Sequence, residues 1–148
     1  MEFYNKEKDN KYKQEKIISH GGFGIIYKVL EIKTKKFYAL KFISIAGKDK
    51  EEIKKECDGE FNIMKNLKNK YIIESKDYFF DEKNEGYCIV MELCNGNLKD
   101  ILKKNKSKGL PLNIVKKIFM QLNEALKTMI NSDIIHRDLK PENILINI

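Results

Sequence analysis

The sequence predicts an α+β fold in which an antiparallel sheet comes first and helices follow, and three observations support this prediction. Short apolar and β-branched runs, separated by turn residues, fill the first half of the chain. After about residue 50 the apolar spacing changes to that of a helix. Residues 136–143 then form a polar segment dense in hydrogen-bonding side chains. The 148 residues suffice for one medium domain with a real core.

Five runs in the first half are predicted to be strands. Residues 12–19, 25–32 and 37–45 come first, with a glycine cluster after the first run and a turn at 33–36 after the second. Connections this short predict an antiparallel meander. Residues 71–80 and 87–93 follow later, on either side of a polar loop at 81–86. The expected sheet therefore has five strands.

One helix is predicted between the third and fourth strands. Ile53, Cys57, Met64 and Leu67 fall on one helical face, and Glu60 occupies the position between Cys57 and Met64. A carboxylate in an apolar seam is costly unless it is paired. The pattern indicates a cationic partner for Glu60, although a place at the edge of the stripe, in water, would also explain it.

The second half of the chain is predicted to be helical. Residues 94–97 form a linker, residues 98–104 a short helix and residues 112–130 a long one. The apolar face of the long helix comprises Val115, Ile118, Phe119, Leu122, Ala125, Leu126 and Met129.

The net charge of +7 does not by itself predict a nucleic-acid partner. Arg137 is the single arginine, and the other 28 of the 29 basic residues are lysines interspersed with acidic residues. Arginine is the side chain suited to bidentate recognition of phosphates and bases. We expect no specific nucleic-acid partner. A salt-dependent affinity for DNA or RNA would support the contrary hypothesis of a lysine-rich polyanion binder.

The sequence also predicts a cytoplasmic protein. No apolar run approaches the roughly 20 residues of a membrane helix, and the first residues lack the apolar core of a signal peptide. Cys57, Cys88 and Cys94 have spacings that suit neither zinc nor a disulfide framework. They are interpreted as reduced thiols. The oligomeric state is not set by these features.

A glycine cluster separates the first two predicted strands. Glycine lets the backbone approach phosphate oxygens and offer its N–H groups to them. A dinucleotide fold would need this turn to lead into a helix, but β-branched residues follow it. An ordinary glycine-rich hairpin turn is the alternative. The cluster reads Ser19-His20-Gly21-Gly22-Phe23-Gly24.

Lys41 follows Ala39 and Leu40 in an apolar strand, where an ammonium group needs an anion. Glu60 and a phosphate group are both candidates. A lysine at the end of a strand, facing solvent, is the alternative.

Residues 136–143, His-Arg-Asp-Leu-Lys-Pro-Glu-Asn, match the catalytic loop H-R-D-L-x-x-x-N without a mismatch. On this motif the chain resembles the protein kinase family, of the serine/threonine type. Ala39-Leu40-Lys41 is similar to the V-A-I-K motif, Glu60 to the glutamate of the helix αC, and residues 90–94 to the hinge. The resemblance runs from about residue 12 to the end. It implies a five-stranded small lobe with one αC helix, and then the first helices and the catalytic loop of the large lobe.

The resemblance implies that ATP is the nucleotide. The glycine turn would cover its phosphates, with Phe23 at the tip, and Lys41, positioned by Glu60, would hold the α- and β-phosphates. Met91 would be the gatekeeper. The implied nucleotide contacts are Ile18, Ser19, Gly21, Gly22, Phe23, Gly24, Ile26, Ala39, Lys41, Met91, Glu92, Cys94 and Leu145; of these, Ile26, Ala39 and Leu145 would sandwich the adenine.

The resemblance also assigns roles in the catalytic loop. Asp138 would accept or orient the proton of a substrate hydroxyl, Asn143 would hold Mg²⁺, and Lys140 would neutralise charge on the transferring phosphoryl group. Lys140, two residues after Asp138, is the form found in serine/threonine kinases, so the expected partner is a protein substrate. His136 is expected to be a packed structural residue.

By this resemblance residues 1–11 are an N-terminal flank, 12–94 the small lobe and 95–148 a partial large lobe. Gly59 inside the αC helix costs about 1 kcal/mol relative to alanine and weakens the expected Lys41–Glu60 pair. No Asp-Phe-Gly occurs before Ile148. We therefore expect the chain to be an incomplete kinase domain that transfers phosphate poorly or not at all alone. The alternative is a non-catalytic nucleotide-binding pseudokinase or an interaction fragment.

Overall fold

The structure, a computed structural model, describes residues 1–147 and divides them into two compact units. The first unit comprises residues 1–66 and 73–93, and the second comprises residues 67–72 and the described chain from residue 94 onward. Each unit is described by itself below.

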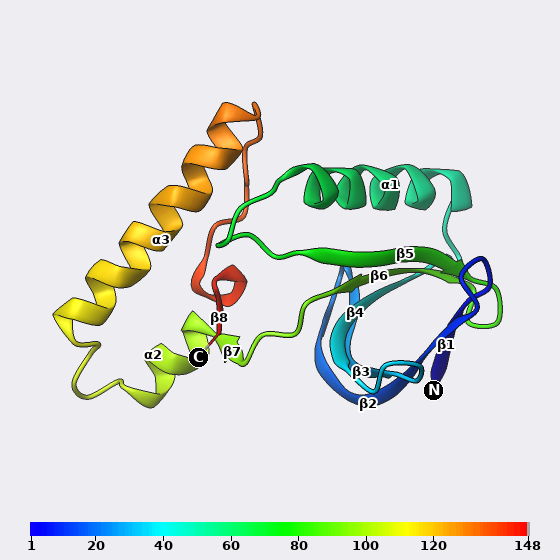
Figure 1. Cartoon of the computed structure of the whole chain (residues 1–148), viewed down its shortest axis with the longest axis horizontal. Coiled ribbons are helices and arrows are strands. Elements are labelled where there is room, and N and C mark those ends of the chain that lie inside the picture. The colour runs from blue at the N-terminus through cyan, green and yellow to red at the C-terminus, as the bar shows by residue number, and fades with distance from the viewer. Residues whose placement is uncertain (148) are drawn as a thin grey trace. The chain divides into compact units, whose positions relative to one another are not determined.

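Six antiparallel strands form the sheet of the first unit (Figure 1). Their order across the sheet is β1-β2-β3-β4-β6-β5. The five predicted strands are present, and the prediction of a five-stranded sheet is wrong by one strand, β1. The bounds are β1 (Glu2–Asn5), β2 (Asn10–Gly21), β3 (Gly24–Glu31), β4 (Phe37–Ser44), β5 (Ser75–Asp81) and β6 (Gly86–Met91).

Strand β1 lies in the segment that was expected to be a flank. Its Phe3 is fully buried, with ring centroids 5.3 Å from Tyr27 and 5.6 Å from Phe42. Asn5 Nδ2 donates to both carboxylate oxygens of Asp77 on β5, at 3.1 and 3.0 Å. Strand β1 therefore pairs with β2 through its backbone and contacts β5 through side chains, so the two edge strands of the sheet meet.

The strands β4 and β6 at the centre of the sheet are largely buried on both faces, which explains their nearly continuous apolar sequences, whereas most of β2 is exposed. Leu40 and Phe42 of β4 point into a core enclosed by the curled sheet, together with Val29, Cys88 and Val90. Ile43 points to the opposite face and packs with residues of the helix α1 (Lys50–Asn66). Residues two apart in a strand share a face, so Ala39 and Lys41 point the same way as Ile43.

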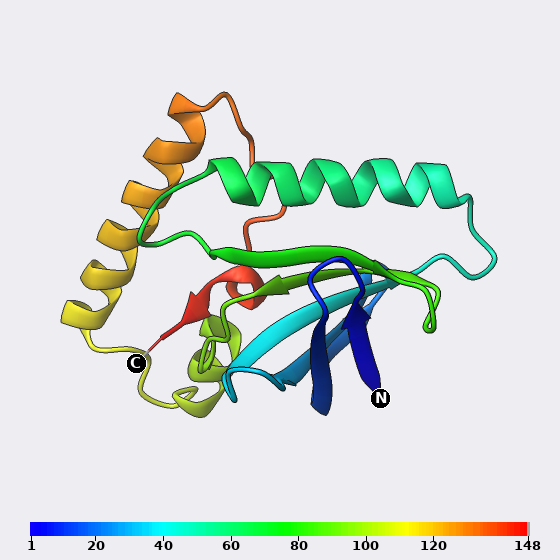
Figure 2. The same ribbon diagram turned by 45° about the vertical axis from the view of Figure 1, so that its right-hand side comes forward.

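Helix α1 lies along strands β5 and β6 (Figures 1 and 2). Asp49 caps its start by accepting backbone N–H bonds from Glu51 at 2.9 Å and Glu52 at 3.2 Å. Ile53 and Cys57 of the predicted stripe are buried. Leu67 is also buried, but it follows the end of the helix and belongs to the second unit.

The second unit contains α2 (Leu98–Lys104), α3 (Leu112–Asn131), a 3₁₀ turn η1 (Pro141–Asn143) and two short strands. The strands β7 (Gly96–Asn97) and β8 (Leu145–Ile146) pair in an antiparallel ladder, so part of the predicted linker at 94–97 is a strand. Residues 67–72 join this unit through Asn69, whose Nδ2 donates to Thr128 Oγ1 at 2.7 Å. None of the helices among residues 1–147 is long and apolar enough to cross a membrane.

Candidate functional site

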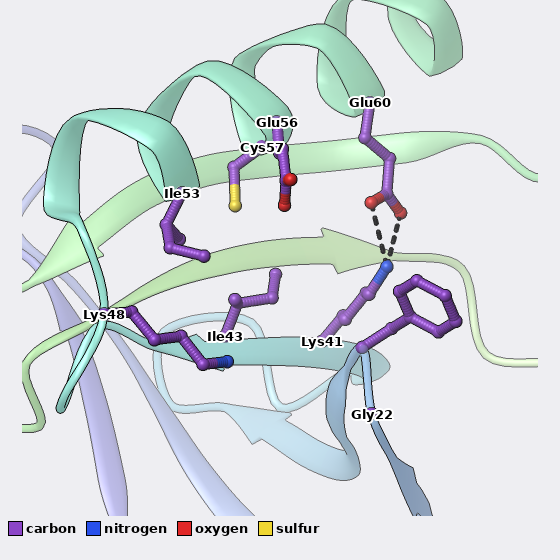
Figure 3. A pocket seen from close by; sticks show the side chains of 9 residues that line it. Gly22, Lys41, Ile43, Lys48, Ile53, Glu56, Cys57 and Glu60 are labelled. Carbon is purple, nitrogen blue, oxygen red and sulfur yellow. Dashed lines mark hydrogen bonds and ion pairs between the residues drawn. The ribbon is translucent and has the colours of Figure 1, made fainter.

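Lys41 and Glu60 form a two-pronged contact on the α1 face of the sheet (Figure 3). Lys41 Nζ lies 2.8 Å from Oε1 and 2.8 Å from Oε2 of Glu60. The lysine side chain is 17% exposed and the glutamate side chain 41% exposed. The expected pair is therefore present, and it is reached from one side by solvent.

The local sequence explains why Glu60 reaches Lys41. Glu60 follows the buried Cys57 by three residues, so both project from neighbouring turns of one helix face. Helix α1 runs without interruption through Gly59, despite the poor helix propensity of glycine.

A pocket opens beside this ion pair, lined in part by α1 and the glycine turn (Figure 3). Its volume of about 80 Å³ is well below the 300 Å³ or more typical of a whole-ligand site, so it accommodates only a small group. The Cys57 thiol lines this pocket, and burial, reinforced by the charge of Glu60, raises its pKa to about 11. The thiol is thus neutral near pH 7. The lining residues are Gly22, Phe23, Lys41, Ile43, Lys48, Ile53, Glu56, Cys57 and Glu60.

The glycine turn connects β2 to β3, and its Gly24 end requires glycine. Gly21 pairs with Gly24 across the hairpin. Gly24 has φ 117°, and a Cβ there would lie 2.4 Å from the backbone oxygen of Phe42. A Cβ on Gly21 or Gly22 would meet nothing within 4 Å, so the backbone of the turn faces open space. Phe23 at the tip is 85% exposed.

Strand register brings several expected nucleotide contacts to the face that carries Lys41. Ile26 pairs with Lys41, Ala39 pairs with Met91, and Ser19 pairs with Ile26. Directly paired residues of antiparallel strands share a face. Ile18 lies in a register irregularity between Ile17 and Ser19 and is 47% exposed, so pairing does not place it on that face.

The expected hinge residues follow β6. The Glu92 backbone N–H donates to the carbonyl of Glu74 at 3.1 Å, and the Glu92 side chain is exposed. Cys94 is half-buried and belongs to the second unit, as does Leu145, which pairs with Asn97.

The loop at 136–143 gathers three of the expected catalytic side chains in the second unit. Asn143 Nδ2 donates to the Asp138 backbone oxygen at 2.8 Å and to Asp138 Oδ2 at 3.1 Å. Lys140 Nζ lies 3.4 Å from the same Oδ2. The Asp138 side chain remains 59% exposed, so it is oriented by its neighbours but still open to solvent.

Local backbone geometry and one ion pair hold this loop. Arg137 adopts φ 66°, a left-handed conformation that turns the chain just before Asp138. Lys99 Nζ contacts Glu142 Oε1 at 2.6 Å, which lowers the pKa of Glu142 and raises that of Lys99. The Leu98 N–H donates to the Ile144 carbonyl at 2.8 Å and fixes the end of the loop to the start of α2.

His136 differs from its expectation. It is exposed rather than packed, and its Nδ1 accepts the backbone N–H of Asp138 at 3.1 Å. Its hydrogen-bond partner is the backbone of a residue two positions later in the same loop, so the side chain is satisfied without being buried.

The chain matches a known protein family over most of its length. The model of the family described as protein kinase domain matches residues 12–148. The chain belongs to the protein kinase family. The match begins at Tyr12, so β1 lies outside the matched region.

Several curated kinases resemble this chain. It is 36% identical over 135 residues to the serine/threonine-protein kinase ppk15 of Schizosaccharomyces pombe, covering 87% of this chain and 24% of that protein. It is 38% identical over 130 residues to the serine/threonine-protein kinase TIO of Arabidopsis thaliana, with 88% and 10% covered. It is 33% identical over 146 residues to the dual specificity protein kinase YAK1 of Saccharomyces cerevisiae, with 95% and 18% covered. The chain thus spans a quarter or less of the length of these three relatives.

Sequence reasoning did not find every side chain around the Lys41–Glu60 pair. Lys48 and Glu56 line the pocket but lie in loop and helix positions that look like ordinary solvated surface in the sequence. The Tyr78 hydroxyl donates to Asp58 Oδ1 at 2.6 Å, next to Gly59 in the same helix. No pattern in the sequence predicts this contact between a tyrosine of a strand and an aspartate of the helix.

Proposed function

We propose that this chain binds Mg·ATP and supplies the nucleotide and catalytic-loop residues for phosphoryl transfer to serine and threonine hydroxyls of protein substrates. The family shows the kinase assignment, and the geometry supports the finer roles. The observation that carries the proposal is the contact between Lys41 and both oxygens of Glu60 beside the glycine turn.

The ion pair suits Lys41 to phosphate binding. A lysine ammonium has three N–H donors. Two of them are directed at the Glu60 oxygens, each 2.8 Å away, which orients the third for a phosphate oxygen. Glu60 thus acts as a positioning residue, and Lys41 as the group that touches the nucleotide. The backbone of Gly21 and Gly22 offers further N–H donors from the turn.

The adenine would bind on the same sheet face. Ile26, Ala39 and Met91 present apolar side chains there, and Ser19 and Ile18 precede the turn. By the resemblance to kinases, we also propose contacts to the base from backbone groups near Glu92 and Cys94 and from Leu145. Phe23 would cover the phosphates from the tip of the turn.

The donor set of the loop fits a magnesium ion. Carboxylate and amide oxygens are the hard ligands that Mg²⁺ prefers. The Asn143 amide nitrogen bonds Asp138, which leaves its Oδ1 as the atom to hold the ion. When bound, Mg²⁺ would neutralise charge on the phosphates. Asn143 is the metal-site residue that we propose.

Asp138 and Lys140 have complementary tasks in this proposal. The Asp138 carboxylate accepts the proton of the substrate hydroxyl, and Asn143 holds it in place for that task. Lys140 Nζ lies 3.4 Å from Asp138 Oδ2 and would stabilise charge on the transferring group. The preference for serine and threonine rests on the family form of Lys140 and on the names of relatives such as ppk15 and TIO.

The test is transfer of the labelled γ-phosphoryl group of Mg·ATP to a mixed library of serine, threonine and tyrosine peptides, comparing the parent with Asp138→Asn. Transfer confined to serine and threonine, and lost in the variant, would support the proposal. Mg·ATP binding without transfer would favour the alternative, a nucleotide-binding module that does not catalyse. Failure to bind Mg·ATP would contradict both.

A further inference from the structure

We propose that Tyr78 is a positioning residue that sets the rotation of α1 and thereby lets Glu60 reach Lys41. This inference rests on the proposed nucleotide role of that pair. The Tyr78 hydroxyl on β5 donates to Asp58 Oδ1 at 2.6 Å, two residues before Glu60.

The two contacts hold the helix from different sides. Residues two apart on an α-helix project about 200° apart, so Asp58 and Glu60 face different directions. The Tyr78–Asp58 bond joins α1 to β5, and the Lys41–Glu60 contact joins it to β4. A rotation of α1 that moved Glu60 away from Lys41 would also have to break or stretch the Tyr78 bond.

Packing reinforces this contact. The Phe61 ring of α1 stacks on the Tyr78 ring, with centroids 4.9 Å apart. Lys54, one turn before Asp58, contacts Asp58 Oδ2 at 2.6 Å and orients the carboxylate so that Oδ1 faces Tyr78. The aspartate is thus held from both sides.

The helix needs such an anchor at this position. Gly59 stands between Asp58 and Glu60, where it loosens the helix by about 1 kcal/mol relative to alanine. The buried residues of α1, Ile53 and Cys57, both precede Gly59, whereas Phe61 and Met64 after it are only partly buried against the same core. Asp58 and Phe61, the two α1 residues that contact Tyr78, lie on either side of Gly59 and Glu60 in the sequence. Anchoring at these two positions would restrain Glu60.

The first test measures, in the absence of nucleotide, how accessible the Lys41 ammonium is when it is paired with Glu60. The rate of Lys41 acetylation by dilute acetic anhydride, followed by peptide mass spectrometry, reports how firmly Glu60 holds the ammonium. Tyr78→Phe should raise this rate about two- to fivefold, as loss of one hydrogen bond predicts. Tyr87→Phe is the matched control, because Tyr87 stacks on Tyr78 at 6.0 Å but does not bond Asp58.

The second test asks whether Tyr78 acts through Glu60. Tyr78→Phe should weaken Mg·ATP binding two- to fivefold in the parent background and leave it unchanged in Glu60→Gln. An equal loss in both backgrounds, or an acetylation rate no higher than that of Tyr87→Phe, would overturn the inference. Absence of Mg·ATP binding in the parent would contradict the proposed function instead, and the acetylation rates would still decide the role of Tyr78.

Discussion

Lys41 Nζ lies 2.8 Å from each carboxylate oxygen of Glu60, although the two residues belong to different elements of the first unit, strand β4 and helix α1. The symmetric contact fixes the direction of the ammonium rather than merely neutralising it. Because the glutamate is 41% exposed, its energetic value is reduced by solvent, and its role is orientation more than stability.

Glu60→Gln is therefore expected to weaken Mg·ATP binding about fivefold while leaving the fold intact. The amide still accepts one hydrogen bond but no longer holds the ammonium with two charged oxygens. Isothermal titration calorimetry measures the change. Glu56→Gln is the control, since Glu56 lines the same pocket one turn earlier. Equal affinities for the two variants would contradict the role assigned to Glu60.

Gly24→Ala is expected to destabilise the protein by about 1–3 kcal/mol. Gly24 has φ 117°, and an added Cβ would lie 2.4 Å from the Phe42 backbone oxygen, so the hairpin has to shift. Urea unfolding gives the free energy. Gly22→Ala, whose Cβ would meet nothing within 4 Å, should change it by less than about 0.5 kcal/mol. Equal stability of the two variants would show that the turn is not built as described.

Phe3→Ala is expected to cost about 3–5 kcal/mol, because the ring is fully buried against Tyr27 and Phe42. The same urea titration applies. Phe23→Ala removes the same ring from a position that is 85% exposed and should have little effect on stability. If Phe3→Ala had the same urea midpoint of unfolding as the parent, β1 would not be part of the sheet in solution.

Asp58 should make stability depend on acid pH. The hydrogen bond from Lys54, and then that from Tyr78, lower its pKa below the ordinary 3.8. A lowered folded-state pKa contributes stability that is present above the unfolded value and lost as pH falls through the folded value. The parent should therefore exceed Asp58→Asn in stability at pH 6, and the difference should shrink below about pH 4. A difference that stayed constant from pH 6 to pH 3 would contradict this assignment.

Features of the fold that depend on residues close together in the sequence could be predicted from the sequence. Helix α2 has the predicted bounds at 98–104, since Asn97 caps it by accepting the Asp100 N–H. The sequence places Lys41 in an apolar strand and Glu60 in the apolar stripe of a helix. The contact between them was expected because an unpaired charge at either position is unfavourable. Both signals lie in the residues themselves.

Long-range side-chain contacts could not be predicted in this way. Strand β1 offers little apolar pattern of its own, and its partner Asp77 lies 72 residues from Asn5. Likewise, Tyr78 reads as one more aromatic strand residue, and its bond to Asp58 spans 20 residues. The exposure of His136 depends on a bond to its own loop, for which sequence spacing gives no signal.

The central claim, that Lys41 and the glycine turn form a nucleotide site, is tested most directly by the melting temperature with and without Mg·ATP. At 100 times the dissociation constant the ligand should add about 2.7 kcal/mol of stability to the parent. The account predicts that Lys41→Ala abolishes this shift, and that Lys48→Ala, which alters the other lysine lining the pocket, retains most of it. No shift in the parent, or an undiminished shift in Lys41→Ala, would contradict the claim.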